Sequence, residues 1–104
     1  MMEKIIRDLR VWLITSTAEQ RAIRKAEYLE KAKRASDDEF KIGYYLLARI
    51  IEEKDVADLQ IKSQSVDLKL RDARALLDQL VIQDVREQFA EYVKVLEYHA
   101  GERD

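Results

Sequence analysis

The scarcity of turn-forming residues constrains the fold of this chain more than any other feature. The 104 residues contain no proline and no asparagine, and the only glycines are Gly43 and Gly101. Sheet sandwiches and barrels need many tight turns, which depend on residues that adopt positive φ or fix φ. The composition therefore argues against an all-β fold. Apolar residues make up 47% of the chain, which is enough for a packed interior. The composition therefore predicts a single α-helical domain over residues 1–104.

The first third of the sequence predicts two helices, over residues 2–14 and residues 18–35. Apolar residues recur in the first at helical spacing, and alanines dominate the inward face of the second. A capping box, in which a hydroxyl and a carboxylate or amide satisfy free backbone N–H groups, is expected between them. Two patterns fit it: Ser16 with Glu19, and Thr17 with Gln20.

The central part of the sequence predicts one continuous helix from Asp37 to about Val81. Ser36 is the expected cap, and Glu39 completes the box. A regular heptad pattern then runs through the second half, which is typical of a coiled-coil seam. Its positions are Leu59, Ser63, Val66, Leu70, Ala73, Leu77 and Leu80. The alternative is a break at Ser63–Ser65 with a new helix from Val66.

Apolar residues wrap most of the way round the first half of this central helix. Ile42, Tyr45 and Leu46 extend the face that carries Leu47 and Ile51. A helix that is apolar on all sides is normally enclosed by other helices, and three or four neighbours are needed here. Because the single chain offers too few, the sequence predicts a homodimer or higher oligomer.

The last helix is predicted over residues 85–99, with Asp84 and Glu87 as its capping box and Gly101 as its C-terminal cap. Short connections on either side of the central helix favour antiparallel neighbours. The expected fold is therefore all-α: a helical bundle or coiled-coil hairpin, built on one long helix with shorter antiparallel helices and completed by oligomerisation.

Charge is unevenly distributed along the chain, although the formal net charge is only −2. Residues 1–35 are basic and residues 36–60 are acidic. The longest mostly apolar run, residues 42–51, is far shorter than the ~20 residues of a membrane span. The first fifteen residues include several charged side chains and no apolar signal-peptide core. These features predict a cytoplasmic protein with no membrane span.

No group of residues predicts an enzyme. The acidic run has helical spacing that could place carboxylates side by side for a divalent metal, but no second Glu-x-x-Asp sequence follows, so a solvated acidic face is expected. Its members are Glu52, Glu53, Asp55 and Asp58. The single histidine, His99, has no partner for a catalytic triad. The absence of cysteine removes thiolate chemistry. We therefore expect no catalytic residues, no metal and no cofactor, with a metal-dependent hydrolase as the weakest alternative.

Two function classes remain. The first is a non-enzymatic, oligomeric protein-interaction module, such as an adaptor, assembly factor or small regulator, acting by coiled-coil or helix-in-groove docking. Its expected interface or core residues are Tyr44, Leu47, Ile51, Leu59, Val66, Leu70 and Leu77. The alternative is a regulator that contacts nucleic acid through the basic helix over residues 18–35. Its candidate residues are Arg21, Arg24, Lys25, Lys31 and Arg34.

Overall fold

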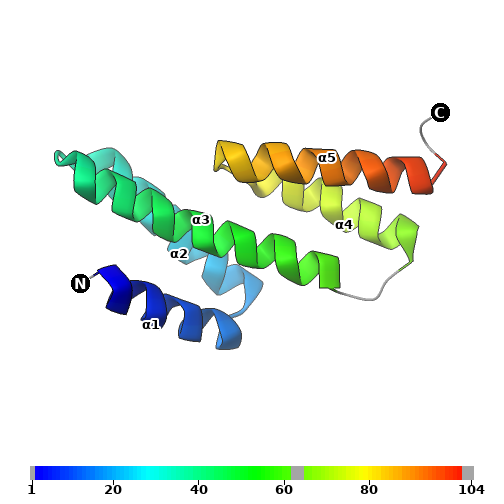
Figure 1. Ribbon diagram of the computed structural model, residues 1–104. Coiled ribbons are helices and arrows are strands. Elements are labelled where there is room, and N and C mark those ends of the chain that lie inside the picture. The colour runs from blue at the N-terminus through cyan, green and yellow to red at the C-terminus, as the bar shows by residue number, and fades with distance from the viewer. Residues whose placement is uncertain (1, 62–64, 102–104) are drawn as a thin grey trace. The chain divides into compact units, whose positions relative to one another are not determined.

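The computed structural model describes residues 2–61 and 65–101, and in these ranges every regular element is a helix (Figure 1). The prediction of an all-α protein is confirmed. The helices are α1 (Met2–Thr15), α2 (Ala18–Arg34), α3 (Asp38–Ile61), α4 (Val66–Gln79) and α5 (Gln83–His99). Of these helices, none is both long enough and apolar enough to cross a bilayer.

The chain divides into two compact units, Met1–Lys54 and Asp55–Asp104, and the boundary falls inside α3. Each unit has a hydrophobic core of its own. The sequence predicted one domain over residues 1–104, and that assignment stays a prediction.

The first unit packs α1, α2 and the larger part of α3 side by side, and successive helices reverse direction (Figure 1). Its core joins α1 to α3 through the buried residues Leu9, Leu13, Leu47 and Ile51. Tyr28 of α2 reaches this core and stacks on Tyr44, with 6.4 Å between the ring centroids. The small residues Ala32 of α2 and Ala48 of α3 are also buried.

The second unit is a hairpin of α4 and α5, with the last turns of α3 packed against it. Its buried residues are Leu70, Ala73, Leu80, Val85, Phe89, Val93 and Leu96. The two helices of the hairpin run in opposite directions (Figure 1), and Arg74 on α4 pairs with Glu97 near the end of α5 at 3.2 Å. Val56 and Leu59 are the α3 residues that contact this core.

The single central helix from Asp37 to Val81 is wrong, because α3 ends at Ile61 and α4 begins at Val66. Ser65 is extended, with φ −61° and ψ 155°, and its hydroxyl accepts a hydrogen bond from the Leu68 N–H at 3.3 Å. A serine hydroxyl at that position satisfies a backbone donor that a new helix leaves free, so it favours a helix start. The other two positions of the expected break, Ser63 and Gln64, lie outside the described residues.

The structure confirms one of the predicted capping boxes. Gln20 N–H donates to the Thr17 hydroxyl at 3.1 Å, and the Gln20 side chain accepts from the Thr17 N–H at 3.0 Å. Before α3, the carboxylate of Asp37 caps instead of Ser36 by accepting from the Glu39 N–H at 2.8 Å. Aspartate and serine cap about equally well, so sequence alone does not rank these neighbours.

The capping box predicted at Asp84 and Glu87 is also wrong. Helix α5 begins at Gln83, two residues before the predicted start at residue 85, and the preceding Ile82 makes no side-chain cap. The guanidinium of Arg86 instead donates to the carbonyl oxygens of Leu77 and Leu80 at 2.6 and 3.3 Å. A cation therefore closes the C-terminal end of α4, where free carbonyl groups favour positive charge. The predicted cap at Gly101 is confirmed, with φ +78°.

Candidate functional site

The five basic residues predicted to contact nucleic acid all interact with groups of their own unit. The Arg21 guanidinium donates to the Ser16 carbonyl at 2.9 Å, and that of Arg24 lies 4.2 Å from the centroid of the Trp12 ring. Lys25 pairs with Glu52 at 3.2 Å. Lys31 lies over the Tyr44 ring at 5.9 Å, and Arg34 pairs with Glu30 at 3.0 Å. The basic helix thus directs much of its charge to contacts that stabilise the fold.

The acidic run is not a uniform solvated face, because Glu52 is completely buried at 0% exposure. Its carboxylate accepts from the ammonium of Lys25, whose side chain is only 12% exposed. A buried carboxylate needs such a partner, since removing a charge from water is costly. Among the residues that the structure describes, every buried side-chain nitrogen or oxygen has a hydrogen-bond partner. Glu52 is therefore part of the packing between α2 and α3.

The remaining groups considered for chemistry do not converge. Glu53 pairs with Arg49 on its own helix at 2.9 Å. His99 lies in the last turn of α5, with its ring edge-on to Tyr98 at 5.9 Å. Within residues 2–61 and 65–101, no three carboxylate or imidazole groups lie close enough together to hold a metal ion.

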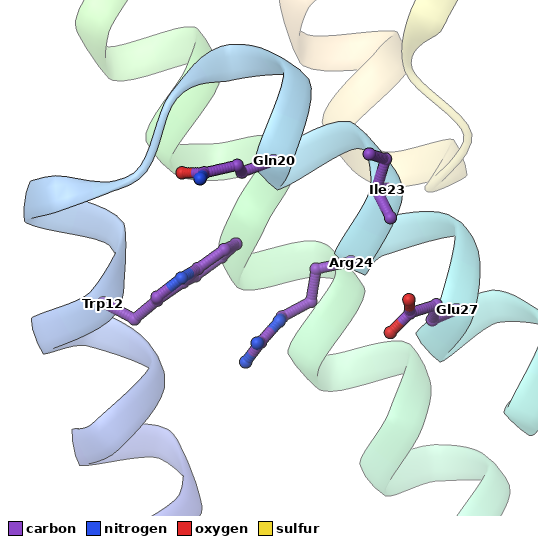
Figure 2. Close-up of a pocket in the computed structure, with 5 residues that line it drawn as sticks. All are labelled: Trp12, Gln20, Ile23, Arg24 and Glu27. Atoms are coloured by element: carbon purple, nitrogen blue, oxygen red, sulfur yellow. The ribbon is translucent and has the colours of Figure 1, made fainter.

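An open pocket of about 230 Å³ lies between α1 and α2. Figure 2 shows its five lining residues: Trp12, Gln20, Ile23, Arg24 and Glu27. The Arg24 side chain extends from α2 towards the indole of Trp12, and the pair forms one wall. The volume is below the ~300 Å³ at which small-molecule sites begin, and the lining lacks a nucleophile.

The outward side of α3 carries the clearest uncovered apolar surface in the first unit. Ile42, Tyr45 and Leu46 are 69%, 44% and 39% exposed. Their spacing places them on one stripe, on the opposite side of the helix from Leu47 and Ile51. We call these three residues the α3 stripe.

The predicted interface or core residues mostly lie in the two cores. Leu47, Ile51 and Leu70 are buried, whereas Val66 is exposed. Tyr44, Leu59 and Leu77 are partly buried against the clusters of their own units. The sequence interpretation did not name the α3 stripe as a site. A helical projection of residues 38–53 would have found it, because the stripe falls opposite the inward-facing Leu47 and Ile51.

The chain matches no known protein family, and no curated protein or solved structure matches it.

Proposed function

We propose that this protein is a non-enzymatic, oligomeric helical interaction module of the cytoplasm that acts by docking its helices against protein surfaces. An adaptor, an assembly factor or a small regulator would work in this way. The observation that carries the proposal is the α3 stripe, a contiguous set of large apolar side chains on an otherwise charged helix face.

The energetics of apolar burial support this function. A fully buried side chain of this size contributes about 1.5–3 kcal/mol relative to an exposed one. About half of the side-chain surface of the stripe is exposed. Covering it with a partner would therefore provide much of this free energy. Apolar residues at this helical spacing are the anchors that a helix uses to enter a partner's groove. The Arg49–Glu53 pair one turn further on would form a polar rim beside them.

The alternative, nucleic-acid contact through α2, has weaker support. Phosphate binding requires cations that can leave their present partners, and Lys25 neutralises a buried carboxylate. Arg24 is stacked on Trp12. To bind a phosphate, Lys25 or Arg24 would have to break at least some of these contacts.

Affinity capture from cell extract with quantitative mass spectrometry tests the proposed function. The native chain is compared with the double variant Ile42→Arg, Leu46→Arg. A matched control, Val81→Arg with Val95→Arg, adds the same charge at exposed valines elsewhere. Proteins retained by the native chain and by the control are expected to be lost from the stripe variant. If all three chains retain the same proteins while circular dichroism reports equal helix content, the proposed function is wrong.

A further inference from the structure

We propose that the outward face of α3 binds the same face of a second copy of this chain in an antiparallel arrangement. This inference rests on the proposed function, and it names both the surface and the partner. The face consists of Asp38 in the first turn of α3, the α3 stripe in the middle, and Arg49 beyond it.

The order of charges along this face carries the inference. Asp38, Ile42, Tyr45 and Arg49 follow one another at steps of four, three and four residues, the spacing of a helix–helix seam. One end of the seam is therefore negative, the middle is apolar and the other end is positive. The side chain of Asp38 is exposed and has no ion pair or hydrogen bond within the described residues.

An antiparallel second copy pairs the negative end of each face with the positive end of the other face. With a twofold axis between Gly43 and Tyr44, Arg49 of each copy meets Asp38 of the other, and Ile42 meets Tyr45. Such an interface is isologous and closed, as in most soluble dimers. A parallel pair would instead place Asp38 against Asp38 and Arg49 against Arg49. Like charges at close range would oppose that arrangement.

The surroundings of the seam agree with this register. Leu46 lies beside the seam, where it would widen the apolar contact. Arg49 is held by Glu53 of its own helix at 2.9 Å, so its guanidinium is already positioned along the face. A guanidinium presents several donors in a fixed fork and can bind a second carboxylate. In the dimer, Arg49 would lie between Glu53 of its own chain and Asp38 of the second copy.

Charge reversal on the full chain tests the surface. We expect Asp38→Arg and Arg49→Glu each to raise the dissociation constant of the dimer by about tenfold or more, because each substitution creates two like-charge contacts. Sedimentation equilibrium measures this constant. An equimolar mixture of the two variants should recover the native dimer fraction, since the heterodimer regains two opposite-charge pairs. The matched controls are Glu91→Arg and Lys94→Glu, at an exposed ion pair of α5, and they should leave the dimer unchanged.

Disulfide trapping tests the register. The chain has no cysteine, so introduced thiols are the only ones present. Ile42→Cys and Tyr45→Cys chains of different mass are mixed and oxidised. The antiparallel register predicts that the mixed disulfide forms faster than either disulfide between identical chains.

The outcomes separate this inference from the proposed function. A dimer that persists in both charge variants, or one that is not recovered in the mixture, overturns the α3 surface and leaves the proposed function standing. A dimer in which identical chains crosslink fastest overturns the antiparallel register. A chain that stays monomeric but loses captured proteins in the α3 stripe variant overturns the second copy as partner while supporting docking on this face. A monomer with no such loss overturns both proposals.

Discussion

At the scale of single residues, Lys25 and Glu52 form a contact that sequence reasoning could not assign, although the opposite charges of residues 1–35 and residues 36–60 favour attraction between the two segments. Glu52 stands in an acidic run that looks solvated, and its partner lies 27 positions away on another helix. The local pattern gives no sign of this pairing because charge spacing along one helix reports only near neighbours. Apolar positions such as Leu47 and Ile51 could be predicted, since periodicity alone places them inward.

Replacing Lys25 by methionine is expected to destabilise the protein by about 3 kcal/mol or more, because the buried carboxylate of Glu52 loses its counter-charge. The double variant Lys25→Met, Glu52→Leu should recover most of this loss, since well-packed apolar side chains often replace a buried pair without cost. Urea unfolding measures both values. Lys33→Met, at an exposed position of α2, is the control. A single variant that loses under 1 kcal/mol would contradict the structural role of the pair.

The contact between Arg24 and Trp12 gives a second prediction at this scale. The chain has one tryptophan, so tryptophan fluorescence, excited at a wavelength that tyrosine does not absorb, reports this site alone. We expect Arg24→Ala to shift the emission of Trp12 to longer wavelength, because the guanidinium no longer covers the ring. Stability should fall by about 0.5–1 kcal/mol. An unchanged spectrum, equal to that of Lys33→Ala, would show that the two side chains do not stack in solution.

At the scale of elements, the positions of four helix starts were predicted to within a few residues. The errors concern the identity of the side chain that caps each helix N-terminus. Helix α2 begins where the Thr17 box places it. Asp37, however, replaces Ser36 before α3, and α5 begins without a side-chain cap. Several neighbouring residues can serve as caps with similar free energy, so tertiary packing selects between them. The continuous heptad misled the prediction of a single rod, because Ser65 lies between seam positions, so it leaves the heptad pattern intact and can still begin a helix.

The capping box at the start of α2 predicts a difference between two neighbouring hydroxyl residues. Thr17→Ala removes the acceptor of the Gln20 N–H and should lower the free energy of unfolding by about 1 kcal/mol. Ser16→Ala should cost less, since its hydroxyl donates to the Leu13 carbonyl at the end of α1 and caps no N–H group. Thermal unfolding of both variants compares them directly. Equal losses, or a larger loss at Ser16, would contradict this assignment.

At the scale of the whole molecule, the described residues form two core clusters that share no residue. The sequence could not reveal this division, because both clusters draw on the same kind of heptad positions and α3 contributes residues to each. The boundary inside α3 depends on contacts between distant helices. Periodicity along one helix carries no information about them.

Truncating the core of the second unit should leave the first unit less affected. Phe89→Ala removes a buried ring, and we expect a loss of about 3–5 kcal/mol from the second unit. Trp12 reports only the first unit, whereas circular dichroism reports all helices. The two signals should therefore unfold at different urea concentrations in this variant. Coincident curves with equal shifts would mean that the chain unfolds as one cooperative body.

The self-association of the native chain bears most directly on the central claim, that the face of α3 left uncovered by its own fold binds a second copy of the chain. Sedimentation velocity over a wide range of concentrations measures it. Because the chain has a mass of 12.3 kDa, the account predicts a reversible shift from that mass to twice its value as the concentration rises. A single species of monomer mass at every concentration would contradict it.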